Sequence, residues 1–441
     1  MSTGPNTEWY AGLSNRGVRL GLEDERELLG RLGSPQDSLR ILHVAGTDGK
    51  GSVCSLMESV LIASGCSVGM FTSPEILSVN ECIRIAGAEI EDADLEQVMG
   101  VVRTEAEAMA AEGRPCTWFE VLTAAALVAF RTAGVEFAVL EVGMGGRLDS
   151  TNVVVPESCV INNIEMEHGR FLGSTLEEIA EQKAGIMKPG VPCATMNPDP
   201  VFRVLEARSA EVGCPLRRIM PEEVGVVSMD PRSIVMEYRG EQFRVGLPGR
   251  HQARNAVLAM ACLAALPDFE ERIRPSLHRG LEDAAWPCRM QKLLADPIVV
   301  DVTHTVGGAR DLASDVSEIY GRVVLVIGML SDKDVDGVMR ELAPVAERVV
   351  VTEPPSPRAM PYLEAAEAAS RHMRVDLACP TVAGAMDAAM GMRRDETVLV
   401  TGSLRMAEGV LRWLNQRSYR SWTSCPECTW AERIPGAARR A

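Results

Sequence analysis

A short apolar segment that ends in a glycine-spaced turn constrains this chain more than any other stretch. Residues 41–52 read Ile-Leu-His-Val-Ala-Gly-Thr-Asp-Gly-Lys-Gly-Ser, and residues 53–63 continue with helical spacing of apolar side chains. This order predicts a strand, a phosphate-binding loop and a helix. Glycines let backbone N–H groups crowd around phosphate oxygens at the positive end of a helix. Lys50 is expected to meet the β- and γ-phosphates, and Ser52 to reach a Mg²⁺ ion.

The loop departs from the common phosphate-loop pattern, G-x-x-x-x-G-K-[ST]. Val44 stands where the first glycine is expected, and Gly51 separates Lys50 from Ser52. A second interpretation therefore stays open, in which the glycines only form a turn between a strand and a helix.

The length and the net charge of the chain limit the classes of function that it can have. With 441 residues, two or three domains are expected. The formal net charge of −16 argues against a nucleic-acid-binding surface, although a local basic pocket for an anionic substrate is compatible with it. Residues 1–13 lack the apolar core of a signal peptide, and residues 121–130 are too few to span a bilayer. We therefore expect a cytoplasmic protein with neither a nucleic-acid nor a membrane partner.

Most of the 12 cysteines stand singly in apolar surroundings, which is typical of a reducing compartment. Cys425 and Cys428 form the exception, but no second pair lies near them to complete a zinc site. Residues 417–441 around them are basic and lack periodicity, so a poorly ordered tail is predicted.

Strand, turn and helix patterns alternate along the rest of the chain, which predicts an α/β fold with parallel sheets covered on both faces. The interpretation places one hairpin at residues 234–246 and a domain boundary near residue 286, after which a second, smaller doubly wound unit begins. The predicted domains are residues 1–285, 286–416 and the tail 417–441. Within the first, the apolar strand at residues 135–141 ends in Glu141, a suitable place for a carboxylate that orders Mg²⁺.

Ten segments in order resemble the folylpolyglutamate synthase/dihydrofolate synthase family of the Mur ligase superfamily. They are residues 32–36, 43–52, 71–74, 119–126, 181–186, 251–252, 286–289, 328–334 and 401–404, together with the strand that ends at Glu141. The resemblance implies a P-loop ATPase-like domain of the Mur ligase central-domain type, followed by a smaller Rossmann-like domain. It implies an ATP-dependent amide ligase that phosphorylates a carboxylate and then lets glutamate attack the acyl phosphate. ATP, Mg²⁺ and a monovalent cation such as K⁺ would be the cofactors. L-glutamate and a pterin or folate would be the substrates of a monomeric enzyme.

The resemblance also suggests roles for individual residues. The nucleotide would be held by Gly46, Thr47, Asp48, Gly49, Lys50, Gly51, Ser52, Asn255, Arg289 and Asp301. The metal would be held by Ser52, Ser73, Glu141, His168 and a carbamylated Lys183. Lys183, Arg289 and His304 would take part in catalysis. Each has a plainer alternative, such as a loop histidine for His168, a solvated helix lysine for Lys183 and a linker ion pair for Arg289.

Several positions depart from the family pattern. Val302, Thr303 and Thr305 stand where the family has Gly, Ala and Asn. Asp48 stands for an Asn, and Glu167 and Gly169 stand for an Asp and a Thr. Val302 cannot easily take a positive φ angle, and Thr305 removes an amide. Three interpretations follow: a folate enzyme with local drift, a ligase of the same chemistry on another carboxylate, and a nucleotide-binding regulator without ligation. Retention of Lys50, Glu141, His168, Lys183 and Arg289 argues against the third.

Overall fold

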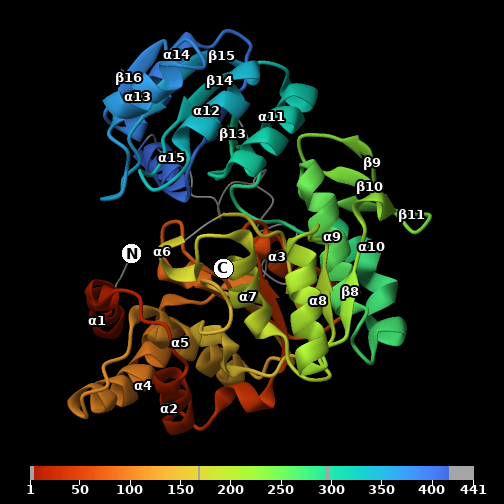
Figure 1. Ribbon diagram of the computed structural model, residues 1–441. Coiled ribbons are helices and arrows are strands. Elements are labelled where there is room, and N and C mark those ends of the chain that lie inside the picture. The colour runs from red at the N-terminus through yellow and green to blue at the C-terminus, as the bar shows by residue number, and fades with distance from the viewer. Residues whose placement is uncertain (1–3, 167–168, 294–296, 417–441) are drawn as a thin grey trace, which may run out of the picture. The chain divides into compact units, whose positions relative to one another are not determined.

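The structure is a computed structural model, and it describes residues 4–166, 169–293 and 297–416 (Figure 1). The predicted tail, with Cys425 and Cys428, lies outside these ranges. The chain forms two compact units: residues up to Val224 join Arg254–Ala284 in the first, and Gly225–Ala253 join the residues from Ala285 onward in the second. The sequence interpretation placed Gly225–Ala253 in the first domain, whereas its contacts group it with the second unit.

The first unit contains an eight-stranded sheet in the order β4-β3-β2-β5-β1-β6-β7-β8. Strands β1, β2, β5, β6, β7 and β8 are parallel, and β3 and β4 are antiparallel additions at one edge. The bounds are β1 Arg40–Ala45, β2 Val68–Phe71, β3 Ile83–Ile85, β4 Ala88–Glu89, β5 Phe137–Glu141, β6 Ser158–Ile161, β7 Cys193–Thr195 and β8 Leu216–Arg218. The central strands β1 and β5 are almost wholly buried, as continuous apolar runs predict for a parallel sheet.

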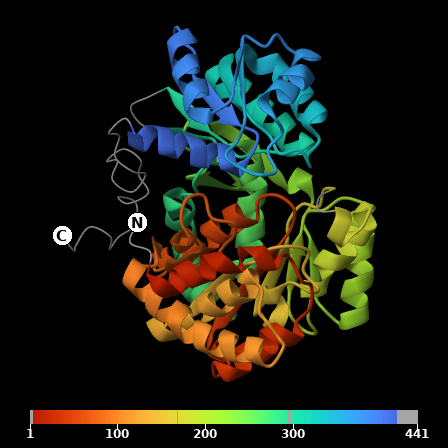
Figure 2. The same cartoon turned by 90° about the vertical axis from the view of Figure 1, so that its left-hand side faces the viewer.

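Helices cover both faces of this sheet. They are α1 Pro5–Gly12, α2 Glu23–Arg31, α3 Lys50–Ala63, α4 Asp92–Ala111, α5 Trp118–Ala133, α6 Gly169–Leu172, α7 Leu176–Lys183, α8 Val201–Val212 and α10 Leu277–Asp283. Helix α3 packs against β1, β2 and β5 and against α10, while α5 packs against β2 and β3. Helices α1 and α4, and α4 and α5, lie side by side (Figures 1 and 2). Phe71, Ala138 and Leu140 of the sheet share one apolar core with α4 and α5.

The second unit contains a six-stranded sheet in the order β12-β13-β17-β14-β15-β16, parallel except for β12. Helices α11, α12 and α13 enclose one apolar core with this sheet, and α14 and α15 pack against it and each other. The strands are β12 Gln291–Leu293, β13 Ile298–Val300, β14 Val323–Ile327, β15 Ala346–Thr352, β16 Leu377–Cys379 and β17 Val398–Thr401. The helices are α11 Val306–Tyr320, α12 Val335–Leu342, α13 Tyr362–Ser370, α14 Val382–Met392 and α15 Leu404–Gln416.

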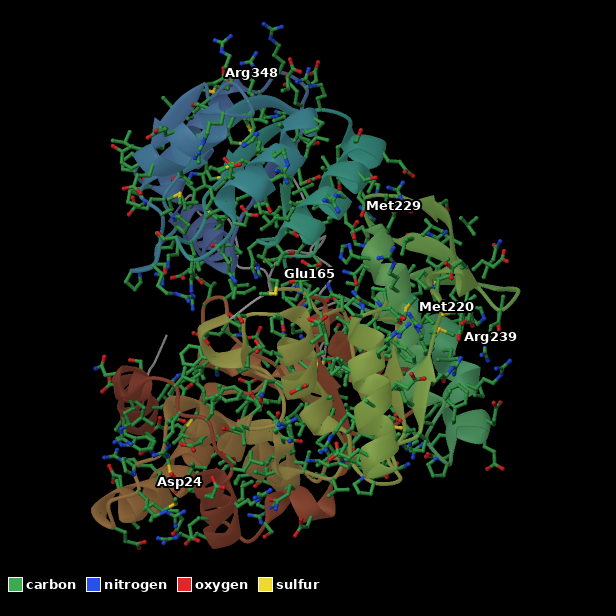
Figure 3. All side chains as sticks on the ribbon, viewed as in Figure 1. Asp24, Glu165, Met220, Met229, Arg239 and Arg348 are labelled. Carbon is green, nitrogen blue, oxygen red and sulfur yellow. The ribbon has the colours of Figure 1, made fainter. Side chains whose placement is uncertain are left out.

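A small sheet, β11-β10-β9, precedes the helix α9 Arg250–Leu263. Its strands are β9 Val224–Met229, β10 Ile234–Tyr238 and β11 Glu241–Val245. The predicted hairpin is confirmed: Arg239 and Gly240 both have positive φ angles, as a two-residue turn between antiparallel strands requires (Arg239 is labelled in Figure 3). The predicted fold class, two α/β units with parallel sheets, is also confirmed.

Candidate nucleotide and metal site

Four neighbouring strands of the first unit end at the same edge of the sheet and bring their loops together. The order β2-β5-β1-β6 places the phosphate loop, which follows β1, between the ends of β5 and β6. Parallel α/β sheets bind ligands beyond the carboxyl ends of their strands, where neighbouring crossovers run in opposite directions. The predicted residues Ser73 and Glu141 follow β2 and end β5, respectively. The sequence therefore places Ser73 and Glu141 at the same edge of the sheet as Lys50.

The phosphate loop has the backbone that its glycines predict. Gly46 has φ +151° and Gly49 has φ +75°, and Gly49 is the residue before the first turn of α3. A Cβ atom on Gly46 would lie 2.8 Å from Cβ of Asn162, and one on Gly49 would lie 2.8 Å from Oδ1 of Asn255. Both glycines are thus required by conformation and by space. Helix α3 begins at Lys50, so the first N–H groups of the helix lie at the end of the loop, as in an anion site.

Asparagines that the sequence interpretation did not assign to the site hold this loop in place. The Asn162 amide donates to the Asp48 carbonyl at 3.1 Å and to Oδ1 of Asn255 at 2.9 Å. The Asp48 N–H donates to Oδ1 of Asn163 at 3.0 Å, and the Thr47 N–H donates to the Asn163 carbonyl at 2.7 Å. Polar residues directly after the apolar strand β6 were the available signal, because that strand ends beside β1.

Further contacts extend this support. The Asn197 amide donates to the Asn162 carbonyl at 2.7 Å. The Glu165 N–H donates to the Thr47 hydroxyl at 3.1 Å, and Glu165 is labelled in Figure 3. Residues directly after β6 therefore hold the loop, and side chains from the segment after β7 and from α9 hold Asn162 in turn.

Two lysines contact the phosphate loop. Lys183, the last residue of α7, is 4% exposed, and its Nζ donates to the Gly46 carbonyl at 2.6 Å. Lys50 Nζ donates to the Thr47 carbonyl at 3.1 Å and lies 3.8 Å from Oε1 of Glu141. The plainer alternative for Lys183, a solvated helix lysine, is wrong because the side chain is buried against the loop. Its carbamylation stays a prediction.

The oxygen donors at this edge fit a hard divalent cation. Glu141 is 6% exposed, and its Oε2 accepts the Ser73 N–H at 3.4 Å. Ser52 is fully buried in the first turn of α3. Within the described ranges, no three or more His, Cys, Asp or Glu side chains are arranged to hold a metal ion. Mg²⁺ at phosphates needs only one or two protein ligands, so a single carboxylate with hydroxyls suffices. The predicted ligand His168 lies outside the described residues.

The predicted residues of the second unit meet at the carboxyl edge of its own sheet. Asp301 follows β13, is 2% exposed, and accepts the Thr303 N–H at 2.8 Å and the Met290 N–H at 3.0 Å. This second bond ties Asp301 to the turn that carries Arg289. Cys288 and Met290, on either side of Arg289, both have positive φ angles, a costly conformation that functional turns often retain. Nε of Arg289 is buried and has no hydrogen-bond partner among the described residues.

Backbone angles and nearby contacts explain how the structure accommodates the departures from the family pattern. Val302 has no positive φ angle and is 4% exposed, so the exchange of glycine for valine is accommodated by an ordinary backbone. Nδ1 of His304 lies 3.0 Å from the Val302 carbonyl. Thr305 is the residue before α11, and its hydroxyl accepts the Gly308 N–H at 3.1 Å. A threonine at this position replaces the lost amide with a helix N-cap. The Glu167 departure lies outside the described residues.

The fold and the phosphate loop define a two-domain ligase of the Mur type, and comparison with known proteins agrees. The Mur ligase middle domain matches residues 44–263, and the Mur ligase glutamate ligase domain matches residues 288–404. A dihydrofolate synthase/folylpolyglutamate synthase of Bacillus subtilis is 34% identical over 368 residues, which cover 80% of this chain and 85% of that protein. The chain belongs to the folylpolyglutamate synthase/dihydrofolate synthase family of Mur ligases. It is therefore an ATP-dependent ligase, as the resemblance predicted.

Solved structures of the same family cover nearly the whole chain. The Escherichia coli FolC protein in complex with DHPP and ADP has a TM-score of 0.82 and 29% identity, covering 94% of this chain and 99% of that one. A bifunctional folylpolyglutamate synthase/dihydrofolate synthase with Mn, AMPPNP and L-glutamate bound has a TM-score of 0.80 and 28% identity, covering 94% and 98%. A probable bifunctional folylpolyglutamate synthase/dihydropteroate synthase of Haloferax volcanii, 32% identical, is longer, and this chain spans 49% of its length.

Proposed function

We propose that this ligase joins the amino group of L-glutamate to the carboxylate of a pterin acceptor, either dihydropteroate, tetrahydrofolate or both. The observation that carries the proposal is the phosphate loop with Lys50 beside Glu141 and Lys183 on Gly46, in a chain that matches both family domains. A carboxylate does not react with an amine at neutral pH, so it needs a phosphate leaving group. A site that clamps ATP phosphates supplies that group.

The reaction balances in two steps. The acceptor carboxylate attacks the γ-phosphorus of ATP, which gives an acyl phosphate and ADP. The glutamate amine then attacks the acyl carbon, and the amide forms as inorganic phosphate leaves and the amine loses a proton. Lys50 and the loop N–H groups would hold the phosphates, and Arg289 and His304 of the second unit would stabilise charge at the transferred group. Mg²⁺ bound through Glu141, Ser52 and Ser73 would neutralise charge on the phosphates.

A second candidate is the same ligation on another carboxylate or another amino acid. Val302 and Thr305 favour it, because they alter the segment that carries His304 while leaving the phosphate loop intact. A regulator that binds ATP without ligation is the least supported alternative, since it gives no reason for the chain to keep Lys50, Glu141, His168, Lys183 and Arg289 together.

Phosphate release from ATP with L-glutamate, measured separately with dihydropteroate and tetrahydrofolate, tests the proposal. Stimulation by dihydropteroate makes the protein a dihydrofolate synthase, and stimulation by tetrahydrofolate makes it a folylpolyglutamate synthase. Stimulation by both makes it bifunctional. Nucleotide binding without stimulation by either acceptor contradicts the pterin assignment and directs the search to other carboxylates.

We also infer a cytoplasmic monomer whose partners are small molecules. Among the described residues, no helix is both long and apolar enough to cross a bilayer. The net charge of −16 disfavours nucleic acid as a partner. Sedimentation of the purified protein tests the monomer, and a mass of two chains would contradict it.

A further inference from the structure

The chain passes from the second unit into the first inside a single helix, α9. Its first four residues belong to the second unit, and from Arg254 onward it belongs to the first. One turn beyond its start, Asn255 accepts a hydrogen bond from Asn162, which also holds the Asp48 carbonyl of the phosphate loop. Helix α9 therefore carries Asn255, which contacts the asparagine that holds the phosphate loop.

The start of α9 is fixed to another helix of the second unit, α11. The N–H of Arg250 donates to Oδ2 of Asp315 at 2.9 Å, and Nη1 of Arg250 lies 3.2 Å from Oδ1 of the same carboxylate. The Arg250 guanidinium also contacts Ser314 and Glu318 on the same side of α11. Because the first N–H groups of a helix have no partner within it, Asp315 supplies both an acceptor and a negative charge where the helix dipole favours one.

The position directly before α9 requires a glycine. Gly249, the residue before α9, has φ +107°, and a Cβ atom there would lie 2.7 Å from the His251 ring and 3.3 Å from Oδ2 of Asp315. Asp315 is fully buried, and burial raises its pKa to about 6 against the opposing effect of Arg250. The buried carboxylate is thus mostly ionised at pH 7, beside the N–H and the guanidinium of Arg250. Nearby Asp311 and Glu318 raise the pKa further.

Helix α11 also carries the catalytic end of the second unit. Its N-cap, Thr305, directly follows His304, so α11 holds the His304 segment at one end and the start of α9 along its length. We propose that Asp315 is a positioning residue for ligation, which with Arg250 fixes the first turn of α9 on α11, the helix that follows His304. The inference rests on the proposed function, because it concerns the turnover in which His304 takes part.

The test compares Asp315→Asn, Arg250→Ala, Arg250→Lys and the double variant Asp315→Asn/Arg250→Ala. Glu341→Gln is the matched control, since Glu341 also pairs with an arginine of α11, Arg310, but from α12. Arg250 is about two-fifths exposed, so its variants are expected to fold even where Asp315→Asn does not. AMPPNP affinity, kcat with the accepted pterin and the melting temperature are measured for each.

We expect the AMPPNP dissociation constant to stay within about twofold, while kcat falls about tenfold in Asp315→Asn and Arg250→Ala, as small misplacements of reacting groups produce. The double variant should be no slower than the slower single variant, because both remove one contact. Arg250→Lys should recover part of kcat, and Glu341→Gln should match the wild type.

Two outcomes overturn the inference: an unchanged kcat in folded Arg250→Ala, or kcat losses in the two single variants that multiply in the double variant. Failure of the proposed function has a different signature, because the wild type itself would then bind AMPPNP and show no turnover with glutamate and either pterin. In that case, amide hydrogen exchange at residues 250–253 replaces kcat. AMPPNP should slow this exchange in the wild type but not in Arg250→Ala, and equal slowing in both overturns the inference.

Discussion

The two sets of predicted site residues are held in place in different ways. In the first unit, the phosphate loop is fixed by side chains distant in sequence, as when Lys183 reaches Gly46 and Asn162 reaches Asp48. In the second unit, the loop after β13 combines local side-chain bonds, with Asp301 accepting from Thr303 and Thr305 capping the next helix, with bonds from distant backbone donors. The N–H groups of Met290 and Gly402 donate to Asp301 and to the Thr303 carbonyl, respectively. The first loop is thus held by lysine and asparagine side chains of other elements, whereas the second is held by its own side chains and by backbone donors from elsewhere in its unit.

This difference indicates a division of labour. A loop braced from several elements is preorganised, so it can bind nucleotide phosphates without paying for its own ordering. The loop after β13 carries His304, which can act on the reacting group without contributing to nucleotide affinity. We therefore expect variants around the phosphate loop to weaken nucleotide or metal binding together with turnover, and variants of His304 to lower turnover alone.

Loss of Lys183 should have the largest effect. Lys183→Ala removes a buried donor from the phosphate loop and, if the amine is carbamylated, a metal ligand as well. We expect phosphate release to fall about 10²- to 10³-fold, the range seen when one preorganised charge-stabilising group is removed. Bicarbonate or a short carboxylic acid should restore part of the rate. Lys188→Ala, in the turn after the same helix, is the control, and full activity in Lys183→Ala would refute the assignment.

His304→Ala tests the predicted site residues of the second unit. We expect kcat to fall by about 10²-fold or more, as removal of a positioned proton-transfer or charge-stabilising side chain does, with unchanged AMPPNP affinity. Thr305→Ser, which keeps the N-cap oxygen, should behave as the wild type. A large loss of AMPPNP affinity in His304→Ala would show that nucleotide binding and turnover do not depend on separate sets of residues.

Glu141→Gln should change the metal requirement more than the maximal rate. The amide keeps the size of the side chain but loses the charge that favours a cation beside Lys50. We expect the Mg²⁺ concentration for half-maximal turnover to rise about 10- to 100-fold, as for other altered metal ligand shells. An identical Mg²⁺ titration in the variant and the wild type would exclude Glu141 from the metal site.

Substitution of Glu25 should have the smallest effect, and this effect is on the stability of the folded protein alone. It is fully buried in α2, and neither carboxylate oxygen has a hydrogen-bond partner among the described residues. Burial, with the nearby charges of Glu120 and Asp149, raises its pKa well above the ordinary 4.5. Because the folded state binds the proton more tightly, the stabilising effect of protonated Glu25 is complete below about pH 4.5 and is lost as pH rises through the folded pKa.

Glu25→Met should therefore raise the free energy of unfolding by about 1–3 kcal/mol at pH 8, since it removes an unsatisfied buried polar group. The gain should shrink at pH 5. Denaturant unfolding at both pH values measures it, with Glu27→Met as the control, because Glu27 is a half-exposed residue of the same helix that pairs with Arg31. Lower stability at pH 8 would mean that Glu25 has a favourable partner in the folded protein.

The sequence predicted much of the fold because central strands carry long apolar runs. The strands that end in Ala45 and Glu141, and the glycines around Lys50, have the pattern that their structure requires. Strands β7, β8 and β16 were not predicted, since three residues at or near a sheet edge carry too little periodicity. The asparagine network was also missed, because Asn162 meets Asp48 only after β6 pairs with β1.

The second unit shows the same limit at its own site. Asp301 and His304 were assigned from the family resemblance, and the bond from Met290 to Asp301 depends on the fold. The contact between Arg250 and Asp315 joins residues 65 positions apart with no shared motif. Contacts of this kind follow from the topology rather than from any local pattern.

Transfer of oxygen from the acceptor carboxylate to phosphate tests the central claim most directly. The pterin that supports turnover is labelled with ¹⁸O in its carboxylate and incubated with the protein, ATP, Mg²⁺ and L-glutamate. Mass spectrometry of the inorganic phosphate then follows the label. Ligation through an acyl phosphate predicts that ¹⁸O enters the phosphate in step with amide formation. Amide product accompanied by unlabelled phosphate, or phosphate released with no amide, would contradict the account.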